Sequence, residues 1–289
     1  MPLKQHGVRL QPITSVDLHA VARFLHEELD PAVPVDRWAS DIRPTWTVDQ
    51  PNYGFMLCCR DDVVGVHLAV YSEREIDGVR QRFCNLAAWC VTDAYRAHAL
   101  RLLRALLRQR AYHFTDLSPS TEVVKLNTRL GFIPLDTTTV AVPNLPWPLR
   151  TRGIRVYSSD RKIERVLHGD DLARYRDHRD AVAARQVVIA QGDNVCHVVF
   201  RCVPRKNIRR FAALVYVSDP DLFRTAAPHF FQHLLLRYGM VATLIEKHVV
   251  DGDFAWSATV SPRAKMFRSA TLRPDQIDFL YSELTNMRW

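Results

Sequence analysis

The chain of 289 residues lacks the sequence motifs that mark several common enzyme classes. It has no HExxH zinc-protease motif, no paired CxxC, no Walker phosphate loop and no nucleophile elbow. Most of its six cysteines lie in strand-like apolar segments, without the paired spacing of metal ligands. We therefore expect buried, reduced thiols and no bound metal, and the sequence disfavours zinc proteases, Walker-type phosphotransferases and α/β-hydrolases.

Long hydrophobic runs are also missing. No apolar stretch reaches the length of a membrane span, and the first residues lack the apolar core of a signal peptide. With 47% hydrophobic and 24% charged residues, the chain has the composition of a soluble protein with ample core material. We expect a cytoplasmic protein without a membrane partner, and the length favours two domains.

The charge balance is basic, with a net charge of +8. Such a balance suits nucleic acid, but it suits anionic coenzymes equally well. The arginines are scattered along the chain and do not gather into one basic tract. Nucleic acid is therefore the less favoured partner.

One stretch, residues 87–107, carries the strongest local signal. Residues 87–91 form a short apolar run that predicts a buried strand, and leucines then recur at helical spacing through Leu107. The connector holds a candidate cap in Thr92 or Asp93, and it holds a cation in Arg96. Because a helix N-terminus presents unpaired N–H groups and a positive dipole end, this turn is a candidate phosphate site.

This stretch resembles the acyl-CoA-binding motif of the GNAT superfamily, the GCN5-related N-acetyltransferases. Val91, Tyr95 and Arg96 match the family's strand-to-helix pattern, whereas Ala99 and Arg101 stand where glycine or another small residue is usual. In that fold the strand splays from its neighbour, and its main chain binds the pantetheine arm and thioester. The resemblance implies the following coenzyme-binding residues: Trp89, Cys90, Val91, Tyr95, Arg96, Ala97, His98, Ala99, Leu100 and Arg101.

The order of predicted elements also resembles the GNAT order from the N-terminus: one strand, a helix pair, three antiparallel strands and the helix just described. A later helix, residues 118–130, ends in the family-like signature Leu130, Gly131 and Phe132. Aligned on that signature, Asn127 occupies the position where many members carry a tyrosine that protonates the departing thiolate. Ser120 stands where an asparagine is common.

The second half repeats this pattern more weakly. Residues 211–218 followed by 219–236 resemble the strand and helix of the first half, and the prolines between residues 140 and 149 suggest a linker. Pro220, Asp221 and Pro228 disfavour phosphate binding in the second connector. We predict an α/β (α+β mixed) fold of two GNAT-like domains, each a mostly antiparallel mixed sheet flanked by helices. The predicted parts are residues 1–139, a linker at 140–150, and a degenerate second domain at 151–289, whose last residues, from Pro274 onward, should form a helix.

The resemblance implies acyl transfer to an amine, which calls for a general base. Candidate catalytic residues are Glu73, Glu75, Asp93 and Asn127, with His98 a weaker base; solvated carboxylates, or a helix cap at Asp93, are the alternatives. Candidate substrate-facing aromatics are Trp38, Trp46 and Tyr53, for which ordinary core packing is the alternative. A nucleophilic Cys84 or Cys90 has no identifiable base beside it.

The resulting hypothesis is an N-acetyltransferase that uses acetyl-CoA as co-substrate and a small-molecule amine, such as an amino sugar or amino acid, as acceptor. The alternative is a GNAT-like binding or regulatory protein without catalysis, which the replaced functional positions favour. We expect either a monomer with an internal pseudo-dimer or a homodimer.

Overall fold

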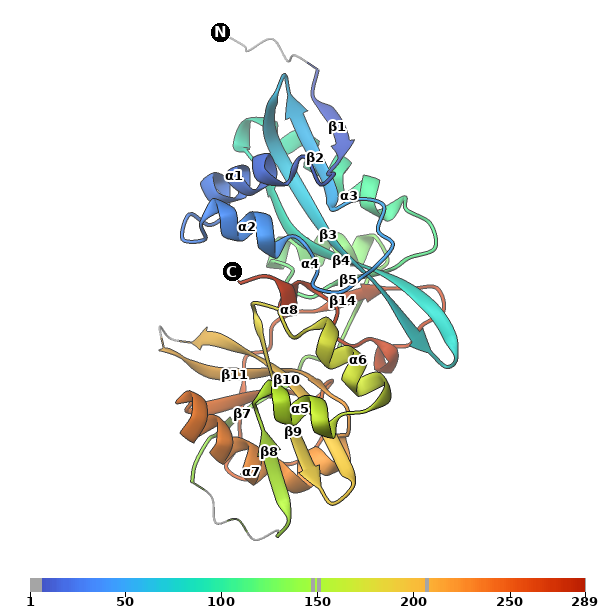
Figure 1. The fold of residues 1–289 in the computed structure, drawn as a ribbon. Coiled ribbons are helices and arrows are strands. Elements are labelled where there is room, and N and C mark those ends of the chain that lie inside the picture. The colour runs from blue at the N-terminus through green and yellow to red at the C-terminus, as the bar shows by residue number, and fades with distance from the viewer. Residues whose placement is uncertain (1–6, 147–148, 150–151, 206–207, 289) are drawn as a thin grey trace. The chain divides into compact units, whose positions relative to one another are not determined.

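The computed structural model describes residues 7–146, 149, 152–205 and 208–288. The chain forms two compact units. Unit 1 comprises Met1–Ile133, Met266–Gln276 and Tyr281–Trp289, and unit 2 comprises Pro134–Lys265 and Ile277–Leu280. Each unit is built on a seven-stranded mixed sheet (Figure 1).

The sheet of unit 1 is mostly antiparallel. In spatial order it contains β1 (Arg9–Pro12), β2 (Gly54–Cys59), β3 (Asp62–Ile76), β4 (Val79–Val91), β5 (His113–Asp116), β14 (Met266–Arg268) and β6 (Ile133–Pro134). β4 and β5 pair in parallel, because the chain crosses over between them through a helix. The three predicted antiparallel strands are confirmed as β2, β3 and β4, and the β3–β4 turn uses Asp77 and Gly78 with positive φ of 51° and 74°.

Helices cover both faces of this sheet (Figure 1). They are α1 (Leu18–Glu28), α2 (Val35–Asp41), the 3₁₀ turn η1 (Asp93–His98), α3 (Ala99–Leu107), α4 (Thr121–Arg129), η2 (Pro274–Gln276) and α8 (Glu283–Asn286). The apolar faces of α1 and α2 pack with Met56, Val66 and Val70 of the sheet. On the opposite face, α3 and α4 pack with Cys84, Leu86 and Phe114. The amphipathic spacing of each helix therefore decides which side it buries.

Unit 2 repeats the arrangement strand for strand. Its sheet runs β8 (Ile154–Tyr157), β9 (Ala184–Gln191), β10 (Asn194–Arg205), β11 (Ile208–Val217), β12 (Ala242–Glu246), β7 (Thr139–Pro143) and β13 (Ala258–Val260). Its helices are α5 (Asp160–Val166), α6 (Gly169–Asp177) and α7 (Pro220–Tyr238). β11 and β12 pair in parallel, as β4 and β5 do in unit 1. The predicted fold class and the internal repeat are confirmed.

In each sheet, one strand lies out of sequence order. β14, which lies between β5 and β6, comes from residues that follow the strands of unit 2. β7, which pairs with β12, precedes all other strands of unit 2. Each unit thus obtains the antiparallel partner of its fifth strand from a distant part of the sequence.

The places of β7 and β14 differ from the expected domain limits. The predicted linker at 140–150 begins within strand β7, and its residues 147–148 and 150–151 lie outside the described part of the chain. Pro143 is accommodated because it is the last residue of that strand. Residues 266–276 and 281–289, expected in the second domain, belong to unit 1. Local proline content gives no information about which sheet edge a segment will join.

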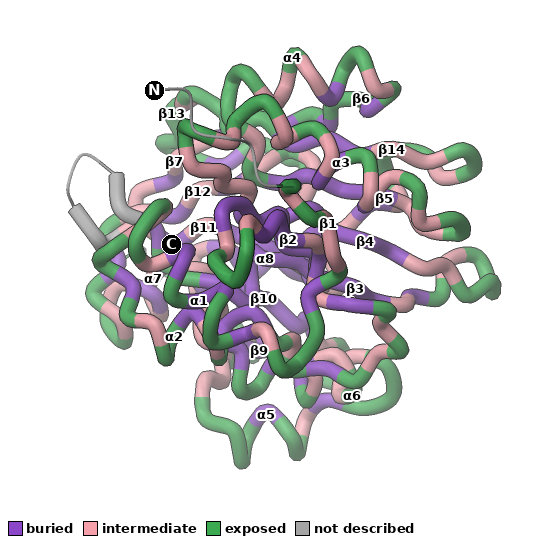
Figure 2. The backbone as a smooth tube through the Cα atoms, turned by 90° about the horizontal axis from the view of Figure 1, so that it is seen from above, coloured by how far each residue is buried: buried purple, intermediate pink, exposed green. Residues whose placement is uncertain are grey.

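The C-terminal segment is less helical than its apolar spacing suggests. In place of one continuous helix the structure has η2 and the four-residue α8, separated by irregular chain. All four residues of α8 are buried, as the tube in Figure 2 shows. Packing on unit 1 therefore takes precedence over local helix propensity. Within the described residues, no helix is long and apolar enough to cross a membrane.

Candidate functional site

The two parallel strands of unit 1 diverge before β4 ends. β4 and β5 pair only from Phe83 with His113 to Leu86 with Asp116, while β4 continues to Val91. Residues 87–91 remain paired with β3 on their other side. Their edge toward β5 therefore has no strand partner among the described residues, and its main-chain groups are available to a ligand.

The start of the turn that follows is hydrogen-bonded to β3. Thr92 donates its amide to Val64 O at 3.1 Å, and Tyr95 donates to Thr92 O at 2.9 Å. Tyr95 packs in a small apolar cluster with Leu102 of α3. No side chain caps the N-terminus of η1 or of α3. The positive end of α3 thus follows the open edge of β4 after the single turn η1.

The two arginines of this turn have different environments. Arg96 is exposed and forms an ion pair with Asp93 at 2.7 Å. Arg101 is half-buried, and its guanidinium donates to the carbonyl oxygen of Val8, the residue before β1, at 3.1 Å. His98 Nδ1 lies 3.4 Å from the same guanidinium. Ala97 and Leu100 are exposed, and Ala99 is the first residue of α3.

The aromatic residue of the open edge is stacked on a buried histidine. Trp89 and His67 lie parallel with their ring centres 4.7 Å apart. Burial lowers the pKa of His67 to about 3, so its imidazole is neutral at physiological pH. Burial also raises the pKa of Cys90, and it raises that of Cys84 to about 12. Thiols of raised pKa are poor nucleophiles, which disfavours a covalent cysteine mechanism.

A buried carboxyl group lies where the strands separate. Asp116 is the last residue of β5, and burial raises its pKa to about 6. Asn127 of α4, which is fully buried, donates its side-chain amide to Asp116 Oδ2 at 2.8 Å. The Ser118 amide also bonds this carboxylate. Asn127 thus binds Asp116 at the position where the resemblance implied a thiolate donor, and Ser120 caps α4 by accepting from the Val123 amide.

The raised pKa of Asp116 predicts a stability change with pH. The pKa of about 6 in the folded protein exceeds the ordinary aspartate pKa of 3.8, so the folded protein binds the proton more tightly than the unfolded chain does. The free energy of unfolding should therefore fall as pH rises from about 4 to about 6, by up to ~3 kcal/mol. Asp116→Asn should remove this step from urea unfolding curves, whereas Asp61→Asn in the exposed β2–β3 turn should not. An unchanged step in Asp116→Asn would contradict the assignment.

The glutamates proposed from sequence lie elsewhere. Glu73 of β3 pairs across the sheet with Arg82 of β4. Arg82 precedes Ala87, the first residue of the open edge, by five residues, or about 16 Å along the strand. The Glu73 carboxylate contacts Arg82 Nε at 3.2 Å and Arg80 Nη1 at 3.4 Å. Glu75 lies further along β3, opposite Arg80. The structure does not bring Glu73 and Glu75 to the open edge of β4, and Asp93 is exposed in its ion pair with Arg96.

The candidate aromatics of the acceptor side are mainly core residues. Trp38 is 1% exposed within the core of α1 and α2. Trp46 is 6% exposed and donates its indole N–H to Tyr71 O at 2.9 Å. Tyr53 is half-buried at the edge of the same core. For Trp38 and Trp46 the structure thus supports the core-packing alternative.

Two residues near the strand divergence were not proposed from sequence. The Ser118 hydroxyl, just beyond β5, donates to Glu283 Oε1 of α8 at 2.9 Å. The Glu283 amide donates to Asn85 Oδ1 of β4 at 2.9 Å. In the sequence, Ser118 is distinguished only as the first residue of the predicted helix at residues 118–130. No local signal linked it to a carboxylate 165 residues later.

The equivalent turn of unit 2 is closed to an anion. The parallel pairing of β11 with β12 ends at Ala213, while β11 runs to Val217. Asp219 then caps α7, accepting from the Leu222 amide at 2.9 Å, and Pro220 has no amide proton. A protein carboxylate thus occupies the helix end where a phosphate would have to bind.

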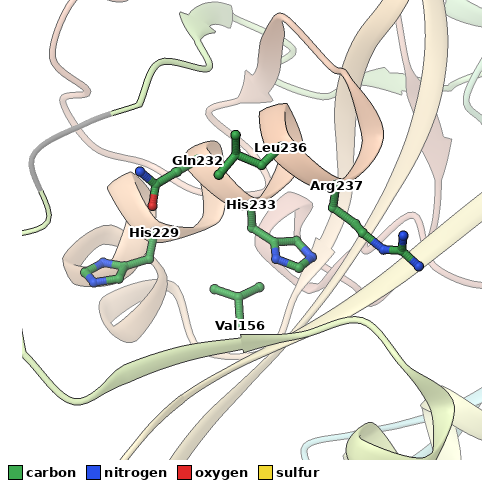
Figure 3. Close-up of a pocket in the computed structure, with 6 residues that line it drawn as sticks. All are labelled: Val156, His229, Gln232, His233, Leu236 and Arg237. Atoms are coloured by element: carbon green, nitrogen blue, oxygen red, sulfur yellow. The ribbon is translucent and has the colours of Figure 1, made fainter.

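Unit 2 also has a pocket of about 380 Å³ that is distant from this turn. It is lined by Val156 of β8 and by five residues of α7: His229, Gln232, His233, Leu236 and Arg237. Figure 3 shows His233 pointing from α7 toward Val156. These α7 residues begin nine positions after Pro220, about 14 Å along the helix. Burial and the nearby Arg237 lower the pKa of His233, so its imidazole is neutral.

No family model matches the sequence, and a search of curated proteins also finds no match. Solved structures, in contrast, share the fold. A GCN5-related N-acetyltransferase from Anabaena variabilis matches 91% of this chain over 72% of its own length, with a TM-score of 0.61 and 11% identity. A putative acetyltransferase from Pyrococcus horikoshii matches 96% of this chain over 94% of its own, with a TM-score of 0.55 and 13% identity.

A third similar structure is the N-myristoyltransferase of Saccharomyces cerevisiae, solved with bound myristoyl-CoA. It matches 100% of this chain over 86% of its own length, with a TM-score of 0.53 and 11% identity. At such identities the likeness concerns the fold alone. The chain therefore has the fold of the GCN5-related N-acetyltransferases, present twice in tandem.

Proposed function

We propose that the protein is an acyl-CoA-dependent N-acyltransferase whose coenzyme binds to unit 1. The observation that carries this proposal is the open edge of β4 at residues 87–91, which leads through the turn η1 into α3, with no side chain capping either of these two elements. An extended strand edge can hydrogen-bond the amide groups of a pantetheine arm. The helix end that follows can hold the pyrophosphate. The GNAT fold of the solved relatives supports the same placement.

In this reaction the main chain of Trp89, Cys90 and Val91 binds the arm and orients the thioester carbonyl. The turn from Tyr95 to Arg101 binds the phosphates, with positive charge from Arg96 and Arg101. The amine of a small acceptor, such as an amino sugar or amino acid, attacks the carbonyl carbon directly. Holding both reactants in one orientation and donating to the developing oxyanion accelerate the reaction.

Calorimetric titration with acetyl-CoA tests the coenzyme site, with myristoyl-CoA titrated alongside to compare chain lengths. Arg96→Glu should weaken binding about tenfold or more, because it places a negative charge beside the diphosphate. Arg104→Glu, with the same charge change on an exposed position of α3, should have little effect. No binding by the wild-type protein at millimolar coenzyme, or equal losses in both variants, would remove the proposal.

A second candidate function is a binding protein of the same fold that does not catalyse transfer. The contact of Asn127 with Asp116 favours it, since the position implied for a proton donor is engaged in a structural hydrogen bond. Release of free thiol from acetyl-CoA across a panel of primary amines distinguishes the two functions. Binding without thiol release would support the second candidate, and turnover with an amine would exclude it.

A further inference from the structure

Glu283 is a carboxylate buried at the sheet of unit 1. The residue is 0% exposed and begins the short helix α8. Removing a carboxylate from water is costly unless other groups compensate, so its retention here calls for a physical reason. Its Oε1 accepts a hydrogen bond from the Ser118 hydroxyl at 2.9 Å.

Ser118 lies at the point where β4 and β5 separate. It follows the last paired residue of β5, Asp116, by two positions, and it is exposed. Its amide bonds the Asp116 carboxylate while its hydroxyl donates to Glu283. An exposed residue just beyond the end of β5 is therefore fixed through its own amide, and its hydroxyl is bonded to a buried carboxylate.

The position of Glu283 is fixed by buried amides. Its own amide donates to Asn85 Oδ1, and the side-chain amide of Asn85 donates to Thr115 Oγ1 at 3.1 Å across the β4–β5 pair. At the other end of α8, Asn286 donates to the carbonyl oxygens of Asp41 and Arg43 at 2.5 and 2.9 Å. These bonds hold the carboxylate against the sheet, as a proton acceptor of fixed geometry requires.

We propose that Ser118 and Glu283 form the proton relay that deprotonates the attacking amine, an inference that rests on the proposed acyl transfer. The amine nitrogen forms a bond to the thioester carbonyl carbon. Its proton passes to Ser118 Oγ as the Ser118 proton passes to Glu283 Oε1, which leaves a neutral carboxylic acid. The C–S bond breaks and the thiolate takes a proton from water. The buried Glu283 returns its proton to Ser118 Oγ as the exposed hydroxyl of Ser118 gives its own proton to the resulting hydroxide.

The relay is tested by turnover of Glu283→Gln and Ser118→Ala, measured as thiol release from acetyl-CoA with an amine panel and with water alone as acceptor. Each variant should lower kcat by about 10²-fold or more while leaving the Kd for acetyl-CoA within about twofold. The double variant should be no slower than the slower single variant, because the two groups act as one unit. Ser118→Thr, which keeps the hydroxyl, should recover most of the rate.

Glu73→Gln is the matched control, since it removes a carboxylate charge from the hairpin end of β3, away from the strand opening. A solvent isotope effect on kcat in the wild-type protein that disappears in Ser118→Ala would support proton transfer through Ser118 in the rate-limiting step. Three results would overturn the relay: full kcat in Glu283→Gln, multiplicative losses in the double variant, or a stable acyl group on Ser118. Absence of acetyl-CoA binding to the wild-type protein would instead remove the proposed function itself, so the two failures are distinguishable.

Discussion

Gly54→Ala is expected to lower the free energy of unfolding by roughly 3 kcal/mol or more. Gly54 opens β2 with a φ of +114°, a conformation that L side chains rarely adopt. A Cβ there would lie 2.2 Å from His67 O and 2.7 Å from Leu68 Cα, both backbone atoms of β3. Relief would require β3 to move beneath the stacked pair of His67 and Trp89. Urea unfolding of the purified variant measures the loss.

Gly78→Ala is the matched control for this prediction. Gly78 also has a positive φ, of +74°, but nothing lies within 4 Å of the Cβ position. It should therefore lose only about 1 kcal/mol, from backbone strain alone. Equal losses in the two variants would show that close approach to β3 is not what requires glycine at position 54.

Phe267→Ala is expected to destabilise unit 1 by about 3–5 kcal/mol, the usual effect of removing a buried aromatic ring. Phe267 is 1% exposed and lies on β14, where it pairs with Thr115 of β5. Hydrogen exchange followed by mass spectrometry should show lost amide protection in β5 and β14. Strands β9 and β10 of unit 2 should keep theirs.

Phe223→Ala provides the converse experiment. Phe223 of α7 is 0% exposed in the core of unit 2, so its removal should lower protection in β10 and β11 instead. If Phe267→Ala loosened β12 and spared β5, β14 would not belong to the sheet of unit 1. That outcome would contradict the place of β14 between β5 and β6.

The sequence by itself predicted the features that depend on neighbouring residues. The apolar run at residues 87–91 and the leucine spacing before Leu107 located the end of β4 and α3. The strand–turn–helix at residues 87–107 also indicated the GNAT resemblance, which the fold confirms. These features follow from backbone preferences and the periodicity of one segment, so a short window contains enough information.

Tertiary structure alone decided the features that join distant segments. The open edge of β4 exists because β5 stops pairing at Asp116, and β14 completes that sheet from residues 266–268. Burial of Asp116 raises its pKa, and packing of α8 brings Glu283 to Ser118 across 165 positions. Sheet edges accept any strand of suitable register, and a carboxylate acquires its pKa from its surroundings. Local sequence predicted the elements, but only their packing assembled the candidate site.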